Sequence, residues 1–467
     1  AVLSGRDALA VLPTGGGKSL CYQLPALIRG GLVVVISPLV ALMEDQVLQL
    51  GRRGIAAACL HAGLDPVRRQ QAMAALRDES LRLLYLAPER LQGEATQRLL
   101  ETHAAEGRLV ALAVDEAHCI SAWGHDFRPD YRRLGLIRRL CPGVPMLALS
   151  ATAAPRVRAD ILRLLDLRSP LVQVSSARRE NLRYAMQRRP RDPMPQVLEA
   201  LEQSRGATLI YARTRRSVEH WAERLQGESV EATPYHAGLD PATRQTALTQ
   251  FLEQERPVLV ATVAFGMGVD RGDVGLVLHL DLPSTPEGYL QESGRAGRDG
   301  QPARCLVLFS PGDRTSLGWA MRAAAGRGTT PDERHRLDLA QQQLRRMEAV
   351  AEGEMCREQA LLLAVGELVD PCGRCDRCSA SPKRKDWSRQ ATTLLTHLDD
   401  FDGTDMRRLG EHLALHETGQ GERWTWLARR LVQEELIRES IDGVQRLQLR
   451  DSGRRYLERP WPLNFAA

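Results

Sequence analysis

A glycine-rich segment near the start of the chain has the residues needed to hold phosphate groups. Residues 12–19 read LPTGGGKS and lie between an apolar segment and an expected helix. Glycines let the backbone turn with its N–H groups pointing inward, a lysine supplies charge for the outer phosphates, and a serine hydroxyl can bind Mg²⁺. A loop that merely turns the chain is the plain alternative. The candidate nucleotide-binding residues here are Thr14, Gly15, Gly16, Gly17, Lys18 and Ser19.

Two further clusters carry charges that suit phosphate chemistry. Asp115 and Glu116 follow an apolar run, which puts them at the carboxyl end of a strand, where open α/β sheets bind ligands. We expect Asp115 to hold Mg²⁺ through water and Glu116 to orient and deprotonate the attacking water. In residues 291–298, glycines space Arg295 and Arg298, and arginine keeps its charge. We expect Arg298, with Arg295 beside it, to stabilise charge on a transferred phosphoryl group. A polar strand end and a pair of surface arginines are the alternatives.

A third candidate site consists of cysteines. Four of the nine cysteines in the chain stand at metal-ligand spacing, namely Cys356, Cys372, Cys375 and Cys378. Four thiolates without histidine or water suit a structural, tetrahedral Zn²⁺. An iron–sulfur cluster is the rival, since CxxCxxC also suits one. The other five cysteines adjoin apolar segments, and we expect them to be buried, reduced thiols.

The elements that must position these residues form a repeated pattern. Short apolar runs alternate with helical patterns, which indicates a parallel sheet flanked by helices. Residues 60–70 (LHAGLDPVRRQ) and 235–245 (YHAGLDPATRQ) are nearly identical, so we predict two copies of one α/β fold. We place the first lobe at 1–170 and the second at 171–312. The phosphate loop lies in one lobe and the paired arginines in the other, which predicts a site in the cleft between them.

Composition sets bounds on the function. A chain of 467 residues with 43% apolar and 26% charged residues predicts several globular domains. The sequence has no apolar run long enough to span a bilayer, so we expect no membrane association. A net charge of +5 permits a polyanionic partner. The cysteine pattern favours a reducing cytoplasm. The chain opens on Ala1, not on methionine, and we expect a trimmed fragment.

Together these residues resemble the RecQ family of superfamily 2 helicases, of the DEAH-box and bacterial type. Within the phosphate loop Pro13 stands where the usual pattern has a glycine, and this Pro13-Thr14 variant is typical of helicase-like ATPases. Further family motifs occupy residues 37–46, 87–90, 150–152, 210–215, 264–270 and 291–300. The resemblance implies two RecA-like lobes that bind ATP and Mg²⁺, with Gly268 and Asp270 also at the nucleotide. Residues 1–7 lack the adenine-reading glutamine of relatives, so adenine selectivity is not predicted.

The segment after the DEAH box (Asp115 to His118) distinguishes this family and is rich in aromatic residues. Trp123, Phe127 and Tyr131 recur every four residues, which on a helix would be a core-facing stripe. Gly124 and Pro129 argue against a helix, and interleaved cations suit bases stacked on rings with phosphates nearby. The resemblance implies an aromatic-rich loop that couples DNA binding to ATP hydrolysis. We assign DNA contact to Trp123, His125, Phe127 and Arg128.

The remainder resembles the family's accessory domains. The resemblance implies a helical zinc-binding domain at 313–382, including a helix over 357–368, and a duplex-binding winged helix at 387–458. The winged helix has expected helices at 388–398, 406–415 and 424–436 and a hairpin around Asp442 and Gly443. The implied function is an ATP-dependent 3′ to 5′ DNA helicase that acts on single-stranded and partially duplex DNA at the nucleoid, in repair and recombination. A DEAH-type RNA helicase and a non-hydrolysing scaffold are the alternatives.

Overall fold

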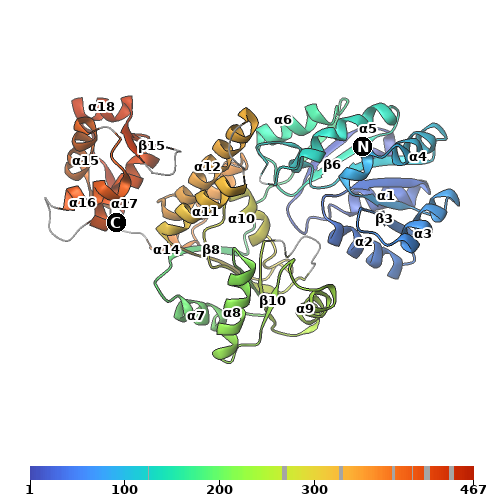
Figure 1. The fold of residues 1–467 in the computed structure, drawn as a ribbon, viewed down its shortest axis with the longest axis horizontal. Helices are drawn as coiled ribbons and strands as arrows, with labels where there is room; N and C mark the ends of the chain where they lie inside the picture. The colour runs from blue at the N-terminus through green and yellow to red at the C-terminus, as the bar shows by residue number, and fades with distance from the viewer. Residues whose placement is uncertain are drawn as a thin grey trace.

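The computed structural model describes residues 1–124, 126–263, 265, 271–324, 330–380, 384–401, 403–414, 421–440 and 446–466. Two α/β lobes lie beside a helical region, and a separate small domain stands at the far side of that region (Figure 1). None of the described helices has the length and apolar character needed to cross a membrane.

The first lobe is a seven-stranded parallel sheet with strand order β3-β4-β2-β5-β6-β1-β7. Neighbouring residues of a strand enter opposite cores: Val34 and Ile36 pack on one face of the sheet and Val33 and Val35 on the other. Both faces are covered by helices, which explains the unbroken apolar runs. The elements are η1 (Val2–Ser4), β1 (Ala8–Val11), α1 (Leu20–Arg29), β2 (Leu32–Ile36), α2 (Val40–Arg52), β3 (Ala57–Leu60), α3 (Pro66–Arg77), β4 (Leu83–Leu86), η2 (Pro88–Gln92), α4 (Glu94–Ala105), β5 (Leu109–Val114), η3 (Ala117–Ile120), η4 (Pro129–Leu134), α5 (Gly135–Leu140), β6 (Met146–Ser150), α6 (Pro155–Leu164) and β7 (Leu171–Val174).

The second lobe repeats this topology with the order β10-β11-β9-β12-β13-β8, all parallel. Numbering its strands from β8 gives the order of the first sheet without β7, which confirms the predicted duplication. Asp65 and Asp240 cap α3 and the matching helix α9, each accepting backbone N–H bonds. The elements are β8 (Leu182–Arg188), α7 (Met194–Glu202), β9 (Ala207–Tyr211), α8 (Arg215–Gly227), β10 (Ala232–Tyr235), α9 (Pro241–Glu253), β11 (Val258–Ala261), β12 (Val274–His279), α10 (Pro286–Ser293) and β13 (Ala303–Phe309).

The predicted boundary between the lobes, at residues 170 and 171, is wrong by one strand. Strand β7 pairs with β1 at the edge of the first sheet, so the first lobe extends to Val174. The side chains of β7 are exposed, and its sequence therefore gives no burial pattern that would assign it to either sheet.

The helical region after β13 contains α11 (Pro311–Ala324), α12 (Pro331–Glu352), α13 (Arg357–Ala364) and α14 (Asp376–Ala380). Helix α13 ends at Ala364, four residues before the predicted end at 368, because Gly366 adopts a left-handed conformation with φ of 82°. Without a Cβ, this glycine also approaches the first lobe, since a Cβ there would lie 2.3 Å from the Cδ of Pro155.

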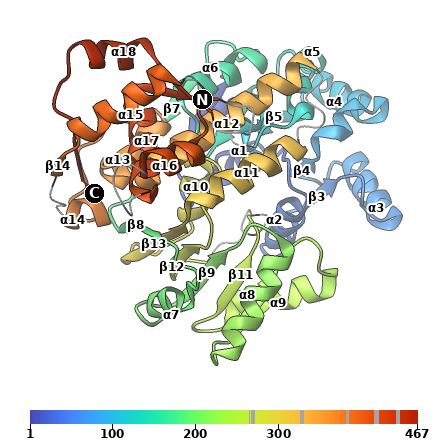
Figure 2. The same ribbon diagram turned by 60° about the vertical axis from the view of Figure 1, so that its left-hand side comes forward.

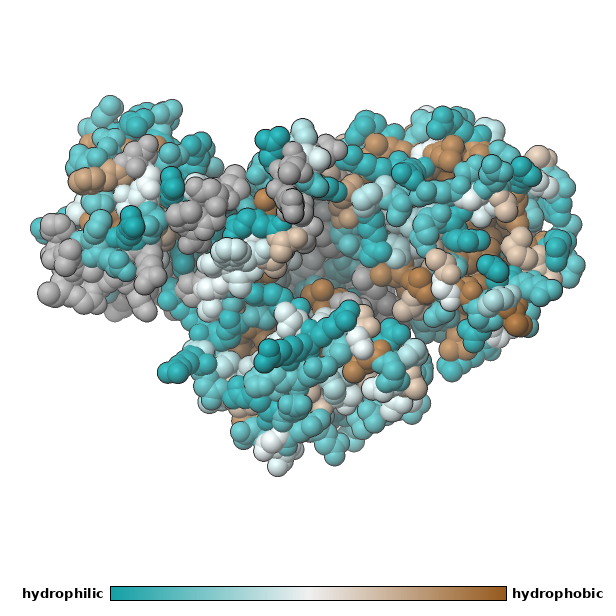
Figure 3. All heavy atoms as spheres, viewed as in Figure 1, coloured by the Kyte–Doolittle hydropathy of each residue, from teal (hydrophilic) through white to brown (hydrophobic). Residues whose placement is uncertain are grey.

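The C-terminal domain has its own apolar core and lies to one side of the two lobes (Figures 1 and 3), while Figure 2 shows it turned toward the viewer. It comprises β14 (Arg384–Asp386), α15 (Ser388–Asp400), α16 (Met406–Ala414), α17 (Gly421–Gln433), β15 (Ile437–Glu439), β16 (Leu447–Leu449), α18 (Asp451–Glu458) and β17 (Asn464–Ala466). The three predicted helices and the antiparallel hairpin are present, while its Asp442-Gly443 tip lies outside the described residues. Strands β14 and β17 pair, which extends the domain beyond the predicted 387–458 on both sides.

Candidate active site and zinc centre

The phosphate loop connects β1 to α1 and has the backbone that its glycines allow. Gly15 and Gly17 have φ of 82° and 75°, a region that other residues enter at a cost. A Cβ on Gly16 would lie 2.9 Å from the carbonyl oxygen of Pro13. Ser19 stands at the N-terminus of α1 and its side chain makes no capping hydrogen bond. The hydroxyl is therefore available to a metal, and the helix end favours phosphate.

The two carboxylates predicted to act with this loop lie at the carboxyl end of β5. Asp115 is buried, and burial together with the neighbouring Glu116 charge raises its pKa to about 6, although Lys18 acts in the opposite direction. Glu116 has a left-handed backbone, with φ of 46°. The Oδ1 of Asp115 accepts the backbone N–H of Glu116 at 2.9 Å, while Oε2 of Glu116 lies 3.2 Å from Nδ1 of His118. Two adjacent carboxylates can therefore serve different roles.

His118 connects this strand end to the next one. Its Nδ1 lies 3.0 Å from the Ser150 hydroxyl and 3.2 Å from Oε2 of Glu116. Burial disfavours the charged imidazole, but contacts with the sulfur of Cys119 and with Glu116 outweigh burial and raise the pKa of His118 to about 10. The Ser150 hydroxyl in turn donates to the carbonyl of Thr152 at 2.8 Å. The carboxylates are thus linked to the segment that begins α6.

The second lobe supplies its two arginines to the same cavity. A cleft of about 610 Å³ is lined by Lys18, Asp115 and Glu116 from the first lobe and by Arg295 and Arg298 from the second. The side chain of Arg298 packs over the phosphate loop, with its Cγ and Cδ 3.6 Å from where a Cβ of Gly15 would be. The structure therefore brings together the residues that the sequence assigned to one site across two lobes.

The donor set of this cleft fits a magnesium nucleotide. Mg²⁺ prefers oxygen ligands, and the Ser19 hydroxyl and the Asp115 carboxylate supply them. Lys18 and the two arginines supply the positive charge that phosphates need. Two predicted nucleotide contacts, Gly268 and Asp270, lie outside the described residues.

The cleft has further lining residues that the sequence did not assign to the site. These are Leu20, Tyr22, Gln23, Leu42, Gln46, Gln49, Arg53, Gly272, Gln291 and Asp299. Gln46 and Gln291 stand inside motifs that the sequence identified, so their motif membership was an available signal. Tyr22 and Arg53 had no such signal, because only the packing of α1 and α2 brings them to the cleft.

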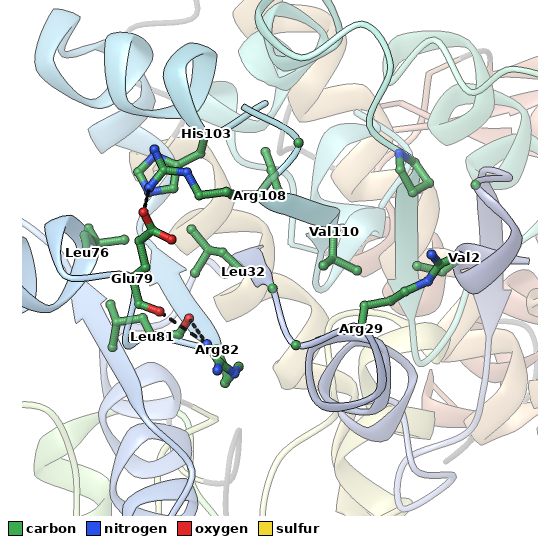
Figure 4. A pocket seen from close by; sticks show the side chains of 16 residues that line it. Val2, Arg29, Leu32, Leu76, Glu79, Leu81, Arg82, His103, Arg108 and Val110 are labelled. Atoms are coloured by element: carbon green, nitrogen blue, oxygen red, sulfur yellow. Dashed lines mark hydrogen bonds and ion pairs between the residues drawn. The ribbon is translucent and has the colours of Figure 1, made fainter. Parts of the chain in front are cut away.

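Another cavity of about 470 Å³ lies at the opposite end of the strands of the first sheet, where β2 and β5 begin (Figure 4). It surrounds the starts of β2 and β5 and contains an ion pair between Glu79 and Arg108. Ligands of open α/β sheets bind at the carboxyl ends of strands, and helices α1, α3 and α4 end near this cavity. Its arginines bind groups of the protein itself: Arg108 pairs with the carboxylates of Glu79 and Glu106, and Arg82 donates to the carbonyls of Glu79 and Leu81.

The side chains of the predicted DNA-contacting loop differ in burial: some lie in the core and others are partly exposed. Tyr131 is fully buried, and its hydroxyl donates to the carbonyl of Asp115 at 3.0 Å, so a core-facing role applies to this ring. Arg128 donates to the carboxylate of Asp126 and to the carbonyl of Pro38 at 2.6 Å. Trp123 and Phe127 are half-buried, and His125 lies outside the described residues. The loop is thus bonded directly to the DEAH segment.

The four cysteines predicted to bind a metal converge. Their sulfur atoms all lie within 4.8 Å of one another, and those of Cys356 and Cys375 are 3.8 Å apart. Tetrahedral Zn–S bonds of about 2.3 Å place two sulfurs about 3.8 Å apart. Backbone N–H groups of Cys372, Cys375 and Cys378 donate to sulfurs of the set at 3.2 to 3.4 Å, which stabilises thiolates. The site fits one structural zinc ion.

Comparison with known proteins agrees with this geometry. The chain matches the family models "DEAD/DEAH box helicase" over residues 1–161, "Helicase conserved C-terminal domain" over 192–300 and "RecQ zinc-binding" over 312–379. It is 40% identical over 83% of its length to "ATP-dependent DNA helicase RecQ" of Haemophilus influenzae, and 38% identical over 89% to the protein of that name from Pasteurella multocida. The chain spans 61% and 63% of these two relatives.

Solved structures show the same fold at low sequence identity. The helicase Lhr of Mycobacterium smegmatis, bound to single-stranded DNA and AMP-PNP, has a TM-score of 0.54 at 18% identity, covering 98% of this chain and 58% of that one. The DEAD-box helicase Mss116, bound to single-stranded RNA and UDP-BeF, has a TM-score of 0.55 at 15% identity, covering 78% and 85%.

The two lobes and the shared cleft define a chain of the DEAD/DEAH-box helicase class. The cysteine centre and its matching model narrow the class further. The chain belongs to the RecQ family.

Proposed function

We propose that this protein is an ATP-dependent DNA helicase that moves 3′ to 5′ along one strand and separates duplexes, in cytoplasmic DNA repair or recombination. The cleft that carries Lys18, Asp115 and Glu116 on one lobe and Arg295 and Arg298 on the other supports this proposal. A site divided between lobes is complete only when they close, so hydrolysis is coupled to motion.

Each residue has a role in hydrolysis that its position supports. The loop N–H groups and Lys18 bind the phosphates, while Glu116 orients the attacking water and takes its proton. Arg298 meets the charge that develops on the γ-phosphoryl group. When bound at Ser19 and Asp115, Mg²⁺ supplies charge neutralisation at the phosphates.

The hydrogen bonds of the aromatic loop support coupling of this site to a nucleic acid. Tyr131 bonds the backbone of Asp115, and Arg128 bonds Pro38 after β2, so a strand that moves the loop also moves the segments around the carboxylates. A protein that contacts a single strand mainly through its phosphates binds with little preference for base sequence. The zinc centre and the C-terminal domain support DNA with duplex regions as substrate, by analogy with the RecQ relatives.

ATP hydrolysis measured with single-stranded DNA, with RNA of the same length and without nucleic acid tests the proposal. We expect DNA to stimulate the rate most strongly. A Lys18→Ala variant is expected to be inactive, whereas Arg82→Ala, which removes a cation from the cavity in Figure 4, is expected to behave as wild type. Stimulation by RNA alone would favour an RNA helicase, and no hydrolysis under any condition would favour a scaffold.

A further inference from the structure

One face of the Trp123 ring is occupied by a side chain of the protein itself. The guanidinium carbon of Arg156 lies 3.4 Å from the centre of the Trp123 ring, which is direct stacking contact. Arg156 is exposed and stands in the first turn of α6, far from the aromatic loop in sequence. His335 of α12 meets the same ring edge-on, at 6.1 Å between centroids.

Helix α6 holds the start of the aromatic loop at two points. One helical turn after Arg156, the carboxylate of Asp160 accepts a 2.7 Å hydrogen bond from the Ser121 hydroxyl. Residues four apart share a face of a helix, so Arg156 and Asp160 hold Trp123 and Ser121 side by side.

The same helix is connected to the hydrolytic residues. It begins shortly after Ser150 and Thr152, and the Ser150 hydroxyl contacts His118, which contacts Glu116. A second path runs from Ser121 back through η3 to the same His118. Trp123 and Glu116 are thus joined through α6 as well as along the chain.

We infer that Arg156 covers the stacking face of Trp123 in the DNA-free protein and is displaced by a base of the incoming strand, which makes it a positioning residue for DNA-coupled hydrolysis. This inference rests on the proposed function. An exposed cation–π contact is weaker than the stacking of a base on an aromatic ring, so the exchange favours DNA. In the absence of DNA, the contact of Arg156 with Trp123 holds the aromatic loop in one arrangement against α6.

Arg156→Ala tests the inference, with Arg158→Ala as the matched control. Both variants remove one positive charge from α6, and the guanidinium of Arg158 lies over no ring of the described residues. Because cover and base compete for one face, loss of an exposed cation–π contact is expected to lower the Kd for a fluorescein-labelled oligothymidylate about two- to fivefold relative to the control. Hydrolysis without DNA is expected to rise, so that the ratio of stimulated to basal rate falls.

A double variant separates uncovering from a general change of charge or helix stability. In the double variant Arg156→Ala/Trp123→Ala, we expect the same Kd as in Trp123→Ala alone. The gain in affinity vanishes because the ring on which the base would stack is gone. A Kd for Arg156→Ala equal to or higher than that of Arg158→Ala would overturn the inference, as would a gain in DNA affinity that survives in the double variant. If the wild type showed no stimulation by DNA, the proposed function itself would fail.

Discussion

Replacement of Arg298 by alanine removes the cation that the second lobe places over the phosphate loop. Its side chain packs against Gly15 and lines the cleft with Lys18 and Glu116. The phosphates of bound ATP are already neutralised in part by Lys18, and the charge that grows during transfer is what Arg298 meets. We therefore expect ATP binding to persist and hydrolysis to be lost.

The size of the loss follows from the electrostatics of the cleft. Two unit charges about 4 Å apart interact by about 4 kcal/mol at an effective dielectric constant near 20. Each 1.36 kcal/mol of barrier corresponds to about tenfold in rate, so kcat is expected to fall about a thousandfold. This value agrees with the lower range for arginine fingers of related phosphoryl-transfer sites.

The assay compares kcat with saturating single-stranded DNA and the Kd of a fluorescent ATP analogue in the same variant. Arg304→Ala is the control, because Arg304 lies on β13 of the same lobe and bonds Gln203 away from the cleft. Arg298→Lys is expected to recover only part of the rate, since it keeps the charge and loses the planar fork. Hydrolysis by Arg298→Ala near the wild-type rate would refute the reasoning, as would equal losses in binding and rate.

Three further variants test separate parts of the molecule. Cys375→Ser is expected to lower bound zinc, measured by mass spectrometry of the metal, from one ion per chain to none and to lower Tm, because zinc binding is coupled to folding; one zinc per chain in this variant would contradict the four-thiolate site. Glu116→Gln is expected to retain ATP and lose turnover, and steady hydrolysis would remove Glu116 as the base. Glu439→Gln removes the charge of a buried pair that joins Arg314 of α11 to the C-terminal domain. We expect this variant to destabilise the contact by about 1–3 kcal/mol and to increase the radius of gyration measured by solution scattering. Glu435→Gln is the exposed control, and equal scattering of the two variants would argue against a docking role for the pair.

Much of the site could be predicted because its chemistry depends on residues that are neighbours in sequence. The turn around Gly15, the adjacent Asp115 and Glu116, and the closely spaced cysteines each form a local unit with a physical requirement for those residue types. The repeated segments fixed the duplication for the same reason, since like segments form like elements.

What the sequence did not disclose depends on contacts between distant segments. The four-residue spacing predicts the same environment for Trp123 and Tyr131. In the structure, however, Trp123 is half-buried, whereas Tyr131 is buried and its hydroxyl donates to the backbone of Asp115. Nothing local marks Arg156 as the partner of Trp123, because its position is set by the packing of α6 on the loop. The exposed strand β7 lacks a burial pattern for a similar reason, since pairing with β1 alone decides its lobe.

Strand displacement tests the central claim most directly. Duplexes with a 3′ or a 5′ single-stranded tail are incubated with ATP, and the released strand is quantified for the wild type and for Lys18→Ala. We expect the wild type to release the strand from the 3′-tailed duplex in an ATP-dependent reaction, with little release from the 5′-tailed duplex and none by Lys18→Ala. Absence of ATP-dependent release from either duplex, in a protein that hydrolyses ATP with DNA, would contradict the account.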